Sequence, residues 1–156
     1  MIASLSYGYN VDVSLIQLAG AYATIANGGI RKPVTLRKIE GNIIDDERVL
    51  SEQTSKEIMS MLEKVAIRGA PRAKINGYRI GGKTGTAQIA AANYASDKHN
   101  ALFVGLAPLT KPKIAIAVIV NEPGGKEYYG GQVAAPVFSE IGSHTLRLLG
   151  MAPDDK

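Results

Sequence analysis

Residues 76–88 read NGYRIGGKTGTAQ, and the conformation of this stretch decides the fold. Gly77 to Thr84 fit the pattern G-x-x-x-x-G-K-[ST], in which a loop between a buried strand and a helix binds phosphate through its backbone amides. The same residues can instead form one extended strand, which places Thr84 and Thr86 on the same side. Lys83 binds the phosphates of ATP in the first conformation and lies beside a cleft for a carboxylate in the second.

The flanking sequence argues against the phosphate-binding loop. The stretch follows RGAPRAKI, which is not a hydrophobic strand, and it continues with Gly85, a poor residue for the first turn of a helix. The apolar strand ending in a magnesium-binding Asp is also missing, since the nearest candidate ends in VIVNE. We therefore expect residues 78–88 to form a strand.

Two further segments complete a predicted sheet. ALFVGLAP (101–108) and KIAIAVIVNEP (113–123) are rich in apolar or β-branched residues, as strands are. The links between the three segments, 93–100 and 108–112, are too short for a parallel crossover, which needs about a dozen residues or more. The sequence therefore predicts an antiparallel meander.

Three amphipathic helices are predicted to flank this sheet, which makes the fold class α+β. The first covers residues 14–27, with Asp12 or Ser14 as its N-cap and Gly28-Gly29 at its end. The second runs from Ser51 to Gly69, and the third covers residues 132–149. The apolar inner faces are expected at Ile58, Met61, Leu62 and Val65 of the second helix, and at Val133, Val137, Ile141 and Leu148 of the third, with Phe138 and Leu149 beside them. Extended pieces are expected at 34–39 and 47–50, and residues 151–156 are expected to fray.

The composition excludes several classes of function. The chain of 156 residues is 46% hydrophobic, which suits one domain, and its lack of cysteine excludes disulfides, thiol nucleophiles and thiolate metal sites. The net charge of +4 is scattered, and two Phe with no Trp argue against nucleic-acid binding. Two distant histidines argue against a metal site, and we expect no cofactor. No apolar run spans a membrane, and the N-terminus lacks a signal peptide, so the chain looks cut within a domain.

The predicted strand 78–88 carries the groups needed to bind an anion. The hydroxyls of Thr84 and Thr86, together with the ammonium of Lys83, can bind a carboxylate through charge-assisted hydrogen bonds. Gly85 removes a side chain where another backbone comes close, and an extended peptide can pair with such an edge. Simple alternation puts Lys83 on the opposite face, so a twist or a bulge at Gly81-Gly82 is needed to bring its amino group to the cleft.

Lys83-Thr84-Gly85 is also the Lys-Thr-Gly motif of penicillin-recognising enzymes. The segments SYGYNVDVSLIQLAGAYATIANGG, GYRIGGKTGTAQ, ALFVGLAP, AVIVNEP and YYGGQVAAPVFSEI occur in the order found in one family and span nearly the whole chain. The chain closely resembles the C-terminal part of the transpeptidase domain of class B penicillin-binding proteins of the cell-division type.

This resemblance implies a serine-type D,D-transpeptidase that cross-links peptidoglycan stem peptides ending in D-Ala-D-Ala during septal cell-wall synthesis, and that β-lactams inhibit. It assigns binding of the substrate or β-lactam to Lys83, Thr84, Gly85 and Thr86, and an oxyanion-hole role to the backbone N–H of Thr86. Tyr128 and Tyr129 either form an aromatic wall beside the cleft or pack a Gly-rich loop. Tyr94 and His99, in the loop after the predicted strand, are expected to be structural or solvated, and Glu122 is expected to be structural. Relatives act with cell-division proteins at the periplasmic face of the inner membrane, where an N-terminal helix anchors them.

Two of the three motifs of this family are missing from the chain. None of its nine serines is followed by Lys three residues on or by Asn two residues on, as Ser-x-x-Lys and Ser-x-Asn require. Thr35 and Thr110 have Lys at the first spacing, which arises readily by chance. We therefore expect residues 1–156 to be the C-terminal portion of the domain, to be inactive without the N-terminal portion, and to expose an apolar patch. The alternative is a non-catalytic binding or scaffold module with the penicillin-binding fold.

Overall fold

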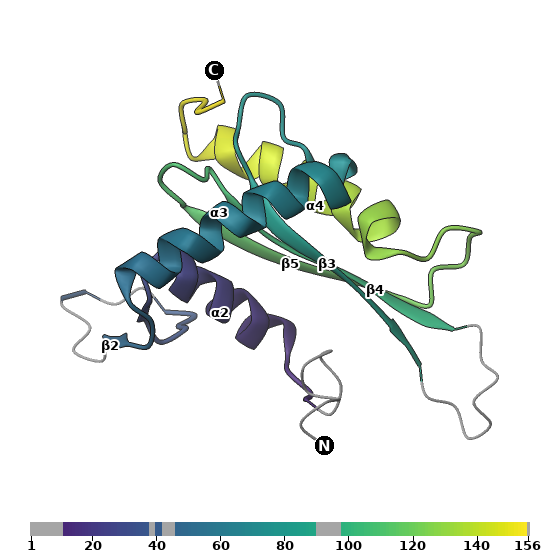
Figure 1. Ribbon diagram of the computed structural model, residues 1–156, viewed down its shortest axis with the longest axis horizontal. Helices are drawn as coiled ribbons and strands as arrows, with labels where there is room; N and C mark the ends of the chain where they lie inside the picture. Colours follow the sequence, from purple (N-terminus) through teal and green to yellow (C-terminus); the bar gives the residue numbers. More distant parts are fainter. Residues whose placement is uncertain (1–10, 38–39, 42–45, 90–97, 156) are drawn as a thin grey trace.

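The computed structural model describes residues 11–37, 40–41, 46–89 and 98–155. Its helices are α2 (Leu15–Ala26), α3 (Glu52–Gly69) and α4 (Gly130–Leu148), with a short 3-10 turn, η1, at Pro71–Ala73 (Figure 1). Its strands are β1 (Ile30–Arg31), β2 (Glu47–Arg48), β3 (Gly81–Gln88), β4 (His99–Ala107) and β5 (Ile114–Asn121). These elements confirm the α+β class.

The main sheet is the predicted antiparallel meander, with the strands in the order β3-β4-β5. The pairing of β3 with β4 is unbroken from Gly81 opposite Leu106 to Gln88 opposite His99. Because residues 81–88 are extended, the phosphate-binding conformation is excluded. The predicted loop 93–100 begins outside the described residues, and its last two residues belong to β4.

A second, two-stranded sheet is shorter than expected. Ile30 of β1 lies opposite Arg48 of β2, so the pairing starts before the extended segment predicted at 34–39. Residues 34–37 form no strand, and 38–39 lie outside the described residues.

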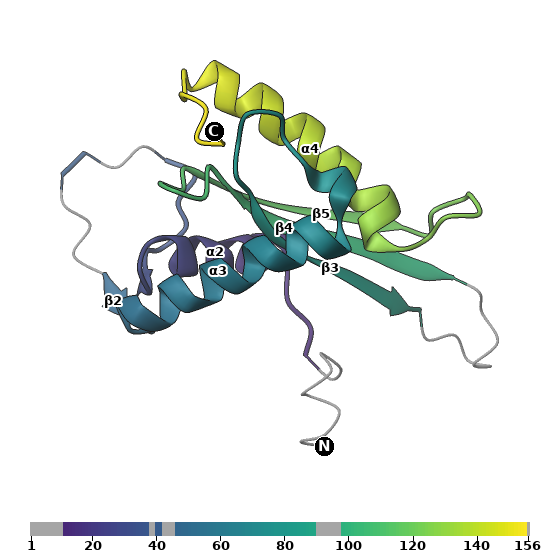
Figure 2. The same ribbon diagram turned by 45° about the horizontal axis from the view of Figure 1, so that its top comes forward.

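Helices cover both faces of the main sheet (Figure 2). α4 packs on β4 and β5 from one side, whereas α2 contacts β5 and β4, and α3 contacts β3, from the other. None of the helices in the described part of the chain is both long and apolar enough to cross a membrane.

The core between the sheet and α4 is centred on two aromatic rings. Phe103 of β4 and Phe138 of α4 are fully buried, and their ring centroids are 4.9 Å apart. A Cβ at Gly105 would lie 2.7 Å from the Phe138 ring, so the helix can approach this closely because the position is glycine.

The predicted N-caps of α2 and α3 are confirmed. Ser14 forms a capping box with Gln17, and the Ser51 hydroxyl accepts from the backbone N–H of Thr54 at 2.9 Å. The prediction for the inner face of α3 is wrong at Met61, which is 56% exposed. The fully buried positions of α3 are Ser55, Leu62 and Ala66.

The prediction for the inner face of α4 is wrong at Val137, Ile141 and Leu148, and at Leu149 beside them, whereas Phe138 is buried as expected. The buried residues are Gly130, Ala134, Ala135, Phe138, Gly142 and Leu146. Val137, Ile141 and Leu148 are 37%, 46% and 87% exposed. Most of the buried residues are small because the helix lies close to the sheet, and Val137, Ile141 and Leu148 point away from it. Their exposure agrees with the expectation that this chain presents an apolar surface.

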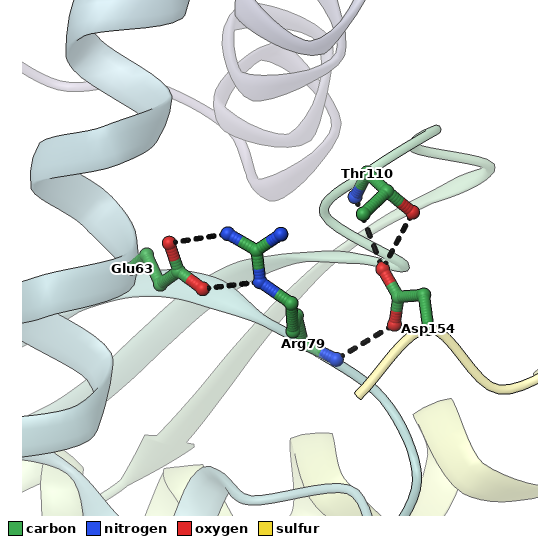
Figure 3. A network of polar contacts seen from close by, with 4 residues as sticks. All are labelled: Glu63, Arg79, Thr110 and Asp154. Carbon is green, nitrogen blue, oxygen red and sulfur yellow. Dashed lines mark hydrogen bonds and ion pairs between the residues drawn. The ribbon is translucent and has the colours of Figure 1, made fainter. Parts of the chain in front are cut away.

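The C-terminal tail is held in place, so the prediction that it frays is wrong for residues 151–155. The Asp154 carboxylate accepts from the backbone N–H of Arg79 at 2.8 Å, and from the N–H and hydroxyl of Thr110 at 3.1 and 2.7 Å. Figure 3 draws these contacts as dashed lines. Burial raises the pKa of Asp154, but these hydrogen bonds and the charge of Arg79 outweigh it, and the pKa is lowered overall. Asp154 is therefore an ionised acceptor at neutral pH.

Candidate functional site

The predicted anion-binding residues lie on β3, which in the described part of the chain pairs with β4 alone. The one-to-one register leaves no bulge at Gly81-Gly82, so the bulge considered from the sequence is wrong. Gly82 is needed for another reason, because a Cβ there would lie 2.5 Å from the ring of Phe103.

Lys83 reaches Thr84 through the length of its side chain. Its Nζ donates to the Thr84 carbonyl oxygen at 2.8 Å and lies 3.3 Å from the Thr84 hydroxyl oxygen. The flexible four-carbon stem therefore brings the ammonium to the hydroxyl without a change in the strand. Lys83 is exposed, so this pair of groups is accessible to a ligand.

The hydroxyls of Thr84 and Thr86 lie on the side of the sheet that α4 covers, as the strand alternation predicted. The Thr86 hydroxyl accepts from the backbone N–H of Gly130, the first residue of α4, at 3.2 Å. A Cβ at Gly131 would lie 3.3 Å from the methyl group of Thr84. Thr86 thus links the site to the helix N-terminus, and its hydroxyl proton remains able to donate to an anion.

A cavity of about 430 Å³ lies against these hydroxyls. Its lining residues are Gly69, Pro71, Arg72, Thr84, Thr86, Tyr129, Gly130, Gly131 and Gln132. Arg72 forms a two-fold ion pair with Glu127 at 2.7 and 3.2 Å, and the hydrogen bond and charge of Arg72 lower the pKa of that carboxyl. The guanidinium is thus partly neutralised. Lys83 does not line this cavity, but its ammonium lies 3.3 Å from the hydroxyl oxygen of Thr84, which does.

A second cavity, of about 320 Å³, lies between α3, the segment 70–80 and the C-terminal tail. Its lining residues are Glu63, Ala66, Ile67, Ala70, Pro71, Lys74, Tyr78, Arg79, Ile80 and Asp155. None of the predicted site residues lines it. We therefore place the candidate site at the cavity beside Thr84 and Thr86.

The two predicted aromatic residues take different positions. Tyr129 is 54% exposed and lines the cavity. Tyr128 stacks on His99, with ring centroids 4.3 Å apart, and packs against Tyr129 at 4.4 Å. Of the two readings that the sequence left open, the position of Tyr129 fits a wall of the cleft, whereas Tyr128 packs its loop onto β4.

Other residues weighed from the sequence are structural or lie elsewhere. Glu122 adopts a positive φ of 47° and forms an ion pair with Lys98 at 2.6 Å, which fits the expected structural role. His99 was expected to be structural or solvated, and nothing in the sequence indicated that it stacks under Tyr128. Tyr94 lies outside the described residues.

The two threonines with Lys at the spacing of a nucleophile motif are engaged otherwise. The Thr35 hydroxyl donates to the Arg37 carbonyl oxygen, and the Thr110 hydroxyl donates to Asp154. Among the residues that the structure describes, no group of three or more His, Asp or Glu residues could hold a metal ion.

Replacing Thr86 by valine should destabilise the chain by about 1 kcal/mol, the usual cost of a lost helix N-cap, because Gly130 loses its acceptor. Thr84→Val is the matched control, because its hydroxyl contacts the exposed Lys83 amine and caps no helix. Urea unfolding followed by circular dichroism measures both. Equal effects of the two substitutions would contradict the capping role of Thr86.

Comparisons with known proteins point to one family. Residues 1–143 match the family model described as penicillin binding protein transpeptidase domain. The chain is 39% identical to the peptidoglycan D,D-transpeptidase FtsI of Escherichia coli K12, over 97% of this chain and 26% of the relative. It is 36% identical to the probable peptidoglycan D,D-transpeptidase PenA of Neisseria meningitidis, with the same coverage of both chains.

Solved structures give the same result. The chain is similar to the apo transpeptidase domain of penicillin-binding protein 3 from Burkholderia pseudomallei, with a TM-score of 0.89 and 43% identity, over 99% of this chain and 48% of that one. It is also similar to a peptidoglycan glycosyltransferase from Burkholderia ambifaria, with a TM-score of 0.86 and 43% identity, over 98% and 46% of the two chains. The chain thus spans about a quarter of the length of the curated relatives it matches.

Proposed function

Because this chain belongs to the penicillin-binding protein transpeptidase domain family, which confirms the resemblance stated from its sequence, we propose that it forms the carboxylate-binding part of a serine-type peptidoglycan D,D-transpeptidase. The observation that carries this proposal is the position of the Lys83 ammonium, within 3.3 Å of the Thr84 hydroxyl on the outer strand β3. Thr86 stands two residues further along the same face, beside the cavity.

The proposed substrate is a stem peptide ending in D-Ala-D-Ala, which lies extended along β3. Lys83, Thr84 and Thr86 bind its terminal carboxylate through charge-assisted hydrogen bonds, each worth about 1.5–3 kcal/mol. β-Lactams carry a carboxylate in a comparable place and bind the same groups. A Cβ at Gly85 would lie 3.2 Å from the side chain of Leu102, on the face opposite the two hydroxyls, so glycine here lets β3 pack closely on β4. Tyr129 borders the ligand in the cavity.

The proposed reaction is acyl transfer. A serine outside this chain attacks the carbonyl carbon of the D-Ala-D-Ala bond, the last D-Ala leaves, and the amine of a neighbouring stem peptide then takes the acyl group. The backbone N–H of Thr86 is proposed as one of two donors to the oxyanion, and a missing donor of this kind costs about 3 kcal/mol of transition-state stabilisation. Because residues 1–156 contain neither Ser-x-x-Lys nor Ser-x-Asn, we expect no turnover by this chain alone.

The location and partners belong to the same proposal. Relatives named FtsI support a role in septal cell-wall synthesis together with cell-division proteins. We accordingly place the working protein at the periplasmic face of the inner membrane, with the nucleophile-bearing portion of the domain as the direct partner of this chain.

Fluorescent penicillin tests the proposal. The isolated chain should acquire no covalent label, and the chain joined to a nucleophile-bearing N-terminal portion should be labelled. Lys83→Met in the joined protein should slow labelling by about 10–100-fold, as expected for one lost hydrogen bond to a charged group. Lys64→Met, which removes an exposed lysine of α3, should leave the rate unchanged.

Two results would contradict the proposal. A labelled residue within the isolated chain would show that the chain holds its own nucleophile. Penicillin binding to the joined protein without covalent labelling would instead support the non-catalytic binding module.

A further inference from the structure

The C-terminal tail holds the residues that lead into β3. The carbonyl oxygen of Gly77 accepts from the backbone N–H groups of Asp154 and Asp155 at 3.0 and 3.1 Å. The Tyr78 hydroxyl donates to the carbonyl oxygen of Met151, and a Cβ at Gly77 would lie 3.4 Å from Pro153. Tail residues 151–155 therefore pack along the segment before the strand.

The peptide groups of Arg79 are fixed on both sides of the residue. Its N–H donates to one oxygen of the Asp154 carboxylate, and its carbonyl oxygen accepts from the N–H of Leu109 at 2.9 Å. The other carboxylate oxygen accepts the N–H and the hydroxyl of Thr110, in the turn between β4 and β5. Figure 3 shows that Asp154 thereby joins the segment before β3 to this turn.

The side chain of Arg79 fixes a third element. Its guanidinium forms a two-fold ion pair with Glu63 of α3 at 2.7 and 2.8 Å, on the side away from Asp154 (Figure 3). Arg79 is thus hydrogen-bonded to helix α3, to the β4–β5 turn and to the tail. Arg79 stands four residues before Lys83, a distance of about 13 Å along an extended strand.

We propose that Asp154 is a positioning residue for the carboxylate-binding strand. Among the described strands, β3 is hydrogen-bonded on one side alone, to β4. Because no second described strand holds its other edge, the contacts of the residues just before β3 have a strong influence on its position. Asp154 fixes that start, and it thereby sets the distance of Lys83, Thr84 and Thr86 from the ligand. This inference rests on the proposed function and adds to it a residue that touches neither the substrate nor the nucleophile.

The test compares Asp154→Asn with Asp155→Asn in the chain joined to a nucleophile-bearing portion. Both substitutions remove one negative charge from the tail, but in the structure it is the Asp154 carboxylate that accepts the hydrogen bonds from Arg79 and Thr110. Asp154→Asn should lower the second-order rate of acylation by benzylpenicillin about tenfold, and Asp155→Asn should leave it unchanged.

The methyl ester of benzylpenicillin separates positioning from loss of folding. It lacks the carboxylate that β3 binds, so Asp154→Asn should slow its acylation by a smaller factor than that of benzylpenicillin, through displacement of the Thr86 N–H alone. A residue that only maintained the fold would lower both rates by the same factor, and that result would overturn the proposal. Asp154→Glu, which keeps the carboxylate, should recover part of the rate with benzylpenicillin.

Hydrogen exchange provides a readout that does not need catalysis. In the same joined protein, Asp154→Asn should speed exchange of the amides of Arg79 and Thr110 and also of residues 83–86. Faster exchange confined to Arg79 and Thr110 would overturn the positioning role. If the wild type acquires no penicillin label, the proposed function fails, and the exchange at 83–86 still decides whether Asp154 controls the strand.

Discussion

Truncation of Phe138 to alanine should destabilise the chain by about 3–5 kcal/mol, the usual cost of removing a buried aromatic ring. The ring is fully buried against Phe103, and Gly105 lies directly beneath it. Neither neighbour can fill the resulting cavity, because Phe103 is held within a central strand and Gly105 has no side chain. The loss would be a large part of the 5–15 kcal/mol that typically stabilises a domain.

Leu148→Ala is the matched control on the same helix. Leu148 is 87% exposed, so its truncation should change the free energy of unfolding by less than about 0.5 kcal/mol. Urea unfolding followed by circular dichroism measures both variants. A larger effect of Leu148→Ala than of Phe138→Ala would mean that the face predicted from the sequence, rather than the observed one, packs on the sheet.

The contrast between these two residues shows why the face of α4 could not be predicted. A hydrophobicity pattern selects the largest aliphatic residues, and Val137, Ile141 and Leu148 fall on one side of the helix. Close packing on a sheet selects small residues instead, so Ala134 and Gly142 face inward although their hydrophobic signal is weak. The period of the helix was readable from the sequence, and its rotation about its axis was not.

The sheet was predictable because its signals are local. Short links fix the antiparallel order of β3, β4 and β5, and the apolar content of 101–108 and 113–123 indicates buried strands. The caps Ser14 and Ser51 likewise act within one helical turn of their own position. Where the physical cause lies within a few residues, the sequence was sufficient.

Some features of the candidate site could be predicted from neighbouring residues, whereas others depend on residues far apart in the sequence. The residue types at Lys83, Thr84 and Thr86 indicated carboxylate binding, but the path of the Lys83 side chain depends on its rotamer and has no sequence signal. The bond from Gly130 to Thr86 joins residues 44 positions apart, and the contacts of Asp154 span a similar or longer separation. Such contacts follow from the packed fold, and no pattern within one segment contains them.

Gly130→Ala should be the most damaging single substitution at the site. A Cβ at Gly130 would lie 2.1 Å from the carbonyl oxygen of Leu102 and 2.5 Å from that of Gly85. Both atoms belong to the paired backbones of β3 and β4, so neither can move away as a side chain would. We expect the start of α4 to be displaced. Overpacking a core usually costs about 1–3 kcal/mol, and this substitution should lower the free energy of unfolding by about 3 kcal/mol or more.

The displacement should reach the proposed ligand-binding groups as well. When Gly130 moves, Thr86 loses the N–H that its hydroxyl accepts, and the cavity beside Thr84 changes shape. In the chain joined to a nucleophile-bearing portion, Gly130→Ala should therefore abolish most labelling by fluorescent penicillin at temperatures where the protein remains folded. Circular dichroism measured on the same samples establishes that they are folded.

Gly124→Ala is the control for this substitution. Gly124 precedes α4 in the same Gly-rich loop, and a Cβ there would meet no atom within 4 Å. Its replacement should leave labelling unchanged and should alter the free energy of unfolding only slightly, with some stabilisation expected because alanine restricts the unfolded chain. Normal labelling of Gly130→Ala would show that α4 can shift away from β3 without changing the site, and the link from Thr86 to the helix would then have no role in binding.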